Sequence, residues 1–514
     1  MTEPDQTTEA EHPALARLAR GVTLAEGARR GGAWMAASSV GTQVFQFAVS
    51  IVMARLLFPS QFGEAALVYS IAGFANIFTD LGLGAAVVHA PRVTEELLSS
   101  AFWLNALTGV ALTLFISALA VPLSLVYGQP QLVGLIIVVS LNFALSCGVV
   151  QLALLERSFN FRRIAIVETG SAIIATIAAP VCALAGLGVY SLAVGPLIGT
   201  VVLSLWLWAS ARWMPRRWIN RASVRELWSF SRGLVGFNSI NYWSRNLDNI
   251  LLGGRVSSAS LGEYNRAYNL MMIPVGQMGA VLLRVLYPAL ARMQDDPRRL
   301  GRAWSRAVAA ATGSITLPLT VTLAATAPAL IKVLYGSRWA GVSPLLELLS
   351  LAAVPQILGA ATGGPYRAAG RTGLLFKLGL VSTTITVLAI VAGLPWGTRG
   401  VATAILIKSW ICLPIVVAPL ARILQLPLRK LLGPAIAGWG PGLAIAAGEL
   451  SVRFLMPVSM PAWQVLSLQL CAGGILYLAA MSRSNDEIAV AARSRLRHLA
   501  TLRLRHRLRP GGVQ

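Results

Sequence analysis

The sequence predicts an all-α polytopic membrane protein with about fourteen transmembrane helices. Only 12% of its 514 residues are charged and 56% are hydrophobic, whereas a soluble domain carries roughly 25% charged residues. The mean hydropathy is +0.67. Apolar segments of roughly 20 residues recur along the chain, and most gaps between them are shorter than about 20 residues. We therefore expect one membrane domain and no separate soluble domain.

The apolar segments set the expected helices in chain order. They lie at about 33–57, 63–89, 98–126, 131–155, 163–185, 187–210, 233–255, 261–290, 304–329, 341–367, 373–395, 398–421, 431–453 and 461–482. Very little polar sequence separates the fifth from the sixth, around Gly186.

The arginines give an independent indication of topology. From Arg157 onward, gaps such as 186–188 and 335–341 carry few charges, while alternate gaps such as 211–232 and 292–306 are rich in arginine. Basic residues concentrate on the cytoplasmic side of membrane proteins. This alternation fits fourteen helices with both termini cytoplasmic, and it explains the net charge of +23 without a nucleic-acid partner.

Several chemistries lack the residues that they need. No Cys or His pair has metal-ligand spacing, and the sequence has no GxxxxGK[ST] motif for a nucleotide phosphate. It also has no arrangement typical of nucleophilic catalysis. We expect no metal, no cofactor and no enzymatic activity. If the protein transports a molecule, the energy would come from an ion gradient or from the concentration gradient of the transported molecule itself.

A short internal repeat joins two parts of the chain. Segments 53–69 and 253–268 each close one helix with an arginine and then turn into Gly-Glu followed by a tyrosine: Gly63-Glu64 with Tyr69, and Gly262-Glu263 with Tyr268. The offset of about six helices gives both copies the same orientation, which predicts a parallel repeat of two bundles. Transporters of that design bind their substrate between the two halves.

The residues around the second copy carry a family resemblance. LGEYNRAYNLMMIPVGQ at 261–277, VLYPALARMQDD at 285–296 and LERSFNFRRIAIVE at 155–168 resemble the Wzx/WzxC-like flippases of bacterial lipopolysaccharide or exopolysaccharide. These form the polysaccharide transporter family of the multidrug/oligosaccharidyl-lipid/polysaccharide (MOP) flippase superfamily. The resemblance covers roughly residues 31–480. It implies two six-helix lobes around a central cavity, two extra C-terminal helices, and outward transport of undecaprenyl-diphosphate-linked glycans.

Together these features predict the domain organisation. We expect an N-terminal tail (1–30), an N-lobe (31–210), a basic linker (211–232), a C-lobe (233–422), two additional helices (423–482) and a basic tail (483–514). The N-terminal tail has no apolar run, so we expect a disordered cytoplasmic segment and no signal peptide. Spaced leucines in the C-terminal tail fit either an interfacial helix or a disordered basic tail.

Polar residues inside the predicted helices 233–255 and 261–290 are the candidate site. Asn238, Asn241, Arg245, Asp248 and Asn249 fall on one face of the former. They line a cavity or form a polar helix interface. The planar guanidinium group of arginine can pair with two oxygens of a diphosphate. The arginine candidates are Arg245, Arg266 and Arg284. The amide candidates for the sugars also include Asn265, Asn269 and Gln277, with Gln43 and Gln46 on the first helix.

Other charged residues leave alternatives open. Arg245 could pair with Asp248 instead of cargo, and Arg284 and Arg255 could extend to the membrane interface. Asp80 could bind a coupling ion or pair with an arginine. Glu347 and Lys377 have no partner that the sequence indicates.

The favoured function is a bacterial inner-membrane flippase for lipid-linked oligosaccharides of O-antigen, exopolysaccharide or capsule, working by alternating access. Expected partners are the lipid-linked glycan, membrane lipids, and a polysaccharide polymerase with its export machinery. The alternatives are a cation-coupled multidrug exporter, a lipid II flippase of the same superfamily, and a membrane polymerase, a class that usually has a large periplasmic loop.

Overall fold

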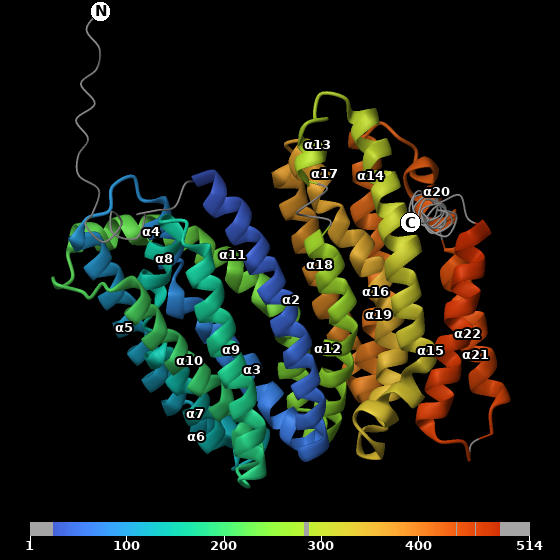
Figure 1. Ribbon diagram of the computed structural model, residues 1–514, viewed down its shortest axis with the longest axis horizontal. Coiled ribbons are helices and arrows are strands. Elements are labelled where there is room, and N and C mark those ends of the chain that lie inside the picture. Colours follow the sequence, from blue (N-terminus) through green and yellow to red (C-terminus); the bar gives the residue numbers. More distant parts are fainter. Residues whose placement is uncertain (1–23, 282–286, 438, 458, 484–514) are drawn as a thin grey trace, which may run out of the picture. The chain divides into compact units, whose positions relative to one another are not determined.

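The structure is a computed structural model that describes residues 24–281, 287–437, 439–457 and 459–483 (Figure 1). All regular secondary structure in these residues is helical, as predicted. The chain forms two compact units that divide in sequence between Gly262 and Glu263. The predicted division into lobes and tails stays a prediction, and both terminal tails lie largely outside the described residues.

The first unit contains a series of helices and one 3-10 turn (Figure 1). They are α2 (Leu24–Leu56), α3 (Pro59–Asp80), α4 (Leu83–His89), α5 (Glu95–Ala118), α6 (Ala120–Tyr127), α7 (Leu132–Leu145), α8 (Val149–Arg157), α9 (Phe161–Leu184), the 3-10 turn Gly188–Tyr190, α10 (Ser191–Ala211) and α11 (Arg221–Gly253). Helix α12 (Ser258–Val281) begins at the end of this unit and continues into the second.

The second unit is also helical throughout its described part. Its elements are α13 (Tyr287–Ala291), α14 (Pro297–Ala311), a π-helical turn (Thr312–Thr316), α15 (Leu317–Leu334), the 3-10 turn Ser337–Trp339, α16 (Val342–Ala361), α17 (Gly363–Ala368), α18 (Thr372–Gly393), the 3-10 turn Leu394–Trp396, α19 (Gly397–Ile423), α20 (Leu428–Ala437), α21 (Gly440–Leu455) and α22 (Ala462–Arg483).

A multi-pass membrane protein is confirmed, but the count of fourteen spans is not. Among the described residues, nine segments are long and apolar enough to cross a membrane, or eleven if two bent helix pairs each count as one span. One of the nine, Thr372–Ile423, is 52 residues long and contains both α18 and α19. Neither α11 nor α12 is among these spans, because polar residues lower their hydropathy. Within the described ranges, each predicted segment nevertheless contains at least one helix.

Small residues bring α9 and α10 together in the first unit. Gly195 and Gly199 form a GxxxG pattern on α10. A Cβ atom on Gly195 would come 2.8 Å from Cβ of Ala179 on α9, and one on Gly199 would come 2.5 Å from Cβ of Ala175. Close backbone approach of this kind is a common way for helices to associate in membranes.

Residues 212–220, the part of the predicted basic linker that lies between α10 and α11, are bonded to the first turn of α5. The Trp213 indole donates to Glu95 at 3.2 Å, and Arg217 forms an ion pair with Glu96. Asn220, which caps the start of α11, donates to Glu96 at 3.0 Å. Because Glu95 and Glu96 lie at the positive end of the α5 dipole, the helix also favours their charge. The linker is therefore bonded into the first unit.

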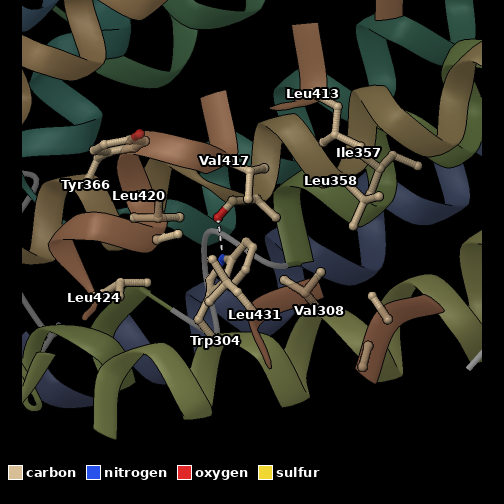
Figure 2. Packing of buried hydrophobic residues seen from close by; sticks show 14 of the residues in the cluster. Trp304, Val308, Ile357, Leu358, Tyr366, Leu413, Val417, Leu420, Leu424 and Leu431 are labelled. Carbon is tan, nitrogen blue, oxygen red and sulfur yellow. Dashed lines mark hydrogen bonds between the residues drawn. The ribbon is translucent and has the colours of Figure 1, made fainter. Parts of the chain in front are cut away.

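A tryptophan organises the apolar core of the second unit (Figure 2). Trp304 on α14 is fully buried, and its indole Nε1 donates to the Ala361 carbonyl oxygen at 2.9 Å. Val308, Ile357 and Val417 pack in the same cluster. The hydrogen bond removes the cost of burying the indole N–H, so the ring can anchor α14 against α16 and α19.

Candidate functional site

The two Gly-Glu turns found in the sequence pack against each other inside the first unit. A Cβ on Gly63 would come 2.7 Å from the Ser258 carbonyl carbon and 3.0 Å from the Gly262 nitrogen. A Cβ on Gly262 would come 2.9 Å from both the Pro59 carbonyl carbon and the Gly63 nitrogen. The contact is thus reciprocal: each glycine faces the backbone of the other copy. Only glycine allows the first turns of α3 and α12 to approach so closely.

The glutamates of the repeat make similar contacts within their own units. Glu64 accepts a hydrogen bond from Gln131 Nε2 at 3.3 Å in the first unit. Glu263 accepts one from the Gly341 backbone in the second, and its carboxylate fills the space beside that glycine. Each carboxylate therefore binds the turn that follows the third helix of its repeat.

These turns extend the internal repeat beyond what the sequence analysis found. Both begin with Tyr-Gly: Tyr127-Gly128 and Tyr335-Gly336. Gly128 and Gly336 have φ angles of 64° and 92°, values that glycine adopts at little cost. The signal was present in the sequence as two copies of Tyr-Gly in the corresponding gaps.

The polar face of α11 is exposed at Asn238 and buried near the C-terminal end of the helix. Asn238 is exposed, whereas Asp248 is 4% exposed and Asn249 is 8% exposed. The backbone N–H of Asn249 donates to Asp248 Oδ1 at 2.9 Å. The side chains of Asn241 and Arg245 lie outside the described residues. Predicted helical spacing placed these residues on one face, but that spacing does not indicate how burial changes along the helix.

Aromatic side chains on α11 explain that burial. Tyr242 donates its hydroxyl to the Ser70 carbonyl oxygen on α3 at 2.7 Å, and the Trp243 ring centroid lies 5.0 Å from that of Phe74. Further along, Gly253 packs on Leu67, whose Cδ1 atom would lie 2.7 Å from an added Cβ. Together these contacts hold the C-terminal half of α11 against α3.

Residues on α12 have specific partners in the second unit. The guanidinium carbon of Arg266 lies 5.6 Å from the ring centroid of Tyr335 and 6.0 Å from that of Trp339, within reach of a cation–π interaction. Asn269 donates from Nδ2 to Asn265 Oδ1 at 2.8 Å. Arg266 therefore supports the turn after α15, a role that the sequence did not indicate.

The remaining candidates are only partly within the described structure. Gln43 and Gln46 are both exposed on α2, and Gln43 donates to Ser39 at 3.2 Å. Arg284 and the side chains of Asp80 and Gln277 lie outside the described residues. The assignment of all these residues to cargo or ion binding stays a prediction.

Glu347 has an ion-pair partner that its sequence position did not indicate. It accepts a hydrogen bond from Arg453 Nη1 at 2.9 Å, which joins α16 to α21 as an ion pair. Lys377 is exposed. Within the part of the chain that the structure describes, no group of three or more His, Cys, Asp or Glu residues is arranged to hold a metal ion.

A cavity of about 460 Å³ lies beside α9 and α10 in the first unit. Its lining includes two guanidinium groups and an indole, from Arg163, Arg212 and Trp206. The Trp206 ring occupies the space over Gly170, where an added Cβ would come 2.7 Å from Cη2 of the ring and closer still to Cζ3. Guanidinium groups beside an aromatic ring suit an anionic headgroup at a membrane interface. Sequence reasoning had used these arginines only as topology signals.

Comparison with curated proteins gives relatives along most of the chain. The lipopolysaccharide biosynthesis protein WzxC of Escherichia coli is 25% identical over 72% of this chain and 76% of its own length. The succinoglycan biosynthesis transport protein ExoT of Rhizobium meliloti is 28% identical over 70% of this chain and 73% of its own length. The teichuronic acid biosynthesis protein TuaB of Bacillus subtilis is 22% identical over 87% of this chain and 94% of its own length.

Solved structures support the fold. The lipid II flippase MurJ in an inward closed conformation matches with a TM-score of 0.70, over 87% of this chain and 98% of that chain, at 15% identity. An inward-facing MATE-family multidrug resistance transporter of the MOP superfamily matches with a TM-score of 0.59, over 75% of this chain and 94% of that chain, at 16% identity. The predicted transporter fold is therefore confirmed.

The family match covers the parts of the chain where the repeat and the polar helices lie. The family described as "Polysaccharide biosynthesis protein" matches residues 52–344, a range that includes both Gly-Glu turns, α11 and α12. The resemblance read from the sequence is confirmed, and the chain belongs to this family of polysaccharide biosynthesis proteins.

Proposed function

We propose that this protein is a flippase that moves undecaprenyl-diphosphate-linked oligosaccharides across the bacterial inner membrane for surface polysaccharide biosynthesis. The family match over residues 52–344 carries this proposal. Two relatives, the lipopolysaccharide biosynthesis protein WzxC and the succinoglycan biosynthesis transport protein ExoT, support the same cargo class. We place the protein in the inner membrane with both termini in the cytoplasm, as the arginine distribution indicates.

The proposed cargo site centres on α11. Its exposed Asn238 offers an amide for sugar hydroxyl groups, and Arg245 lies about two turns further along the helix. A guanidinium at that depth would pair with the diphosphate. Asp248 and Asn249 are buried, so we assign them to holding α11 in place rather than to the sugars.

Other predicted residues keep roles in this proposal. Arg284, Gln277 and Asn269 would extend the site along and beyond α12, and the exposed Gln43 and Gln46 would add amides from α2. Arg266, which lies over two aromatic rings, would act by fixing the turn after α15. Asp80 stays a candidate for ion coupling. The cavity beside Arg163 and Arg212 would bind headgroups of surrounding lipids.

Alternating access between the two halves of the repeat would move the cargo. The protein would perform no covalent chemistry, and the driving force would be an ion gradient or the cargo gradient. A polysaccharide polymerase and export machinery would then take up the delivered units.

Deletion of the gene in the bacterium that carries it tests the cargo. We expect loss of surface polysaccharide and accumulation of a lipid-linked glycan at the inner leaflet, both reversed by the gene on a plasmid. Unchanged polysaccharide would contradict the proposal. Accumulation of lipid II, or loss of drug efflux with normal polysaccharide, would instead favour one of the two alternative transport functions.

A matched pair of arginine variants tests the site. Arg245→Ala is expected to abolish complementation, whereas Arg255→Ala should complement normally, because Arg255 is exposed just after the end of α11. Immunoblots of membrane fractions must show equal amounts of both variants. Normal export by Arg245→Ala would remove Arg245 from the cargo site. Complementation by Arg284→Ala is compared with that by Arg255→Ala in the same way. Loss of export would indicate that Arg284 binds cargo, and normal export would indicate that it only contacts the membrane interface.

A further inference from the structure

A buried polar cluster joins α21 and α22 to α15. Glu449 on α21 and Gln469 on α22 are each 1% exposed. Thr322 on α15 donates from Oγ1 to Glu449 Oε1 at 2.9 Å. On the other side, a Cβ added to Gly473 of α22 would come 2.8 Å from the same carboxyl oxygen. The Glu449 carboxyl group is therefore enclosed between two helices, and the absent side chain at Gly473 makes room for it.

The amide orientation of Gln469 is set by its neighbours. Its Nε2 atom donates to the Glu449 backbone carbonyl at 3.1 Å and to the Ala325 carbonyl at 3.3 Å. Both partners are carbonyl oxygens, which only accept hydrogen bonds. The nitrogen of the amide must therefore face them, and its oxygen is left as an acceptor.

Two oxygen atoms of this cluster have no hydrogen-bond partner. They are Glu449 Oε2 and Gln469 Oε1, and both are buried. Thr322 already donates its single hydroxyl proton to the other carboxyl oxygen. The cluster therefore contains two acceptor oxygens for which it has no donor. A single proton on Glu449 Oε2 would convert that oxygen into a donor, and a hydrogen bond from it to Gln469 Oε1 would then satisfy both.

Charged groups on the helices packed around Glu449 are engaged elsewhere or lie at helix ends. Arg453, one turn along α21, donates to Glu347 at 2.9 Å. Lys332 is exposed in the last turn of α15, and Arg483 ends α22. The other titratable side chains of α22 are Cys471 and Tyr477. An ionised carboxylate buried in this setting would be costly, which again favours a neutral, protonated group.

We propose that Glu449 is a proton-binding site whose bound proton is shared with Gln469 and holds α21 and α22 against α15. Release of the proton would leave a buried negative charge opposite an amide oxygen and would weaken the attachment of both helices. The proposal concerns the last two helices only and does not depend on which cargo the protein carries.

Infrared difference spectroscopy tests the proton directly. The full chain is purified in lipid nanodiscs, and spectra are recorded near neutral pH in H₂O and D₂O. We expect wild-type protein to show a protonated carboxylic acid band that shifts in D₂O and is lost in Glu449→Gln. The control Glu347→Gln should keep the band, because Glu347 is ion-paired. Gln469→Leu should shift the band without abolishing it, since it removes the neighbouring amide but leaves the acid in place.

Thermal unfolding as a function of pH gives a second, independent test. Glu449→Gln places an amide N–H where the proton would be, so it should fold normally. Unfolding wild-type protein would release the proton, because an exposed glutamate is ionised above about pH 4.3. Wild-type stability should therefore fall as pH rises, with the unfolding constant increasing up to about tenfold per pH unit until the folded site is also ionised. The Glu449→Gln variant should lack this fall in stability with rising pH.

Two results would overturn the proposal. One is an acid band of equal intensity in wild type and Glu449→Gln. The other is stabilisation of wild type, but not of Glu449→Gln, by added Na⁺ together with rising stability at higher pH. That pattern would identify a sodium site, because a metal cation needs the ionised carboxylate.

Discussion

Replacing Gly63 with alanine is expected to destabilise the first unit, although alanine is the better helix former. In a helix interior without neighbours, Gly→Ala stabilises by up to about 1 kcal/mol. At Gly63 the new Cβ would lie 2.7 Å from the Ser258 carbonyl carbon, whereas carbon atoms normally stay about 3.5–4.0 Å apart. The Ser258 carbonyl oxygen is closer still, so the first turns of α3 and α12 would have to separate by more than about 1 Å.

The size of the effect follows from these opposing contributions. Overpacking of this kind costs about 1–3 kcal/mol, and the gain in helix propensity offsets part of it. We expect a net loss of about 1–2 kcal/mol, or a melting temperature about 2–8 °C lower. Circular dichroism of the purified protein during heating measures the shift.

A matched glycine provides the control. Gly41 lies on α2 with no atom within 4 Å of an added Cβ, so Gly41→Ala should leave the melting temperature unchanged or raise it. Gly262→Ala should resemble Gly63→Ala, because the contact is reciprocal. If Gly63→Ala matched or exceeded the stability of Gly41→Ala, the argument that these two turns require glycine would be wrong.

The other predictions concern hydrogen bonds and an ion pair. Trp304→Phe should destabilise the protein by about 1–3 kcal/mol, measured by chemical unfolding, because it leaves the buried Ala361 carbonyl without its donor at 2.9 Å. Arg157→Met should have a similar effect, since Arg157 Nη1 donates to three carbonyl oxygens at the end of α4, at 2.6–3.2 Å. A double-mutant cycle with Glu347→Gln and Arg453→Met should give a coupling energy of only about 0.2–1 kcal/mol, reduced by salt, because both side chains are about one-third exposed.

Each of these predictions has a control or a contrary result. Trp463→Phe, at a residue that is 60% exposed, should change stability little, and Arg162→Met should do the same at another exposed residue. If the free energy of unfolding fell equally at the buried and the exposed positions, loss of the hydrogen bonds would not be the cause. A coupling energy that high salt leaves unchanged would contradict a partly solvated ion pair.

Hydropathy and charge predict the helices well but not their breaks. Each predicted helix has a helical counterpart, yet the predicted segment 63–89 is divided into α3 and α4. Leu81 and Gly82 cause that break with φ angles of 48° and 69°. The predicted helix 131–155 bends by 44° between α7 and α8. Such breaks depend on local backbone geometry and tertiary packing, which hydropathy averages over.

The site was only partly predictable for a related reason. Polar residues at helical spacing singled out α11, but spacing alone does not indicate the burial of Asp248, which depends on the contact between α11 and α3. The partner of Glu347 is 106 residues away in sequence, so no local spacing could indicate it. Repetition was more informative, since the Gly-Glu turns were recognisable from sequence alone.

The hydrogen-bonded linker between α10 and α11 has a mechanical consequence. Trp213, Arg217 and Asn220 bind the first turn of α5. The segment between α10 and α11 therefore cannot move independently of α5 when the protein changes conformation. A pull on the start of α11 is passed directly to α5.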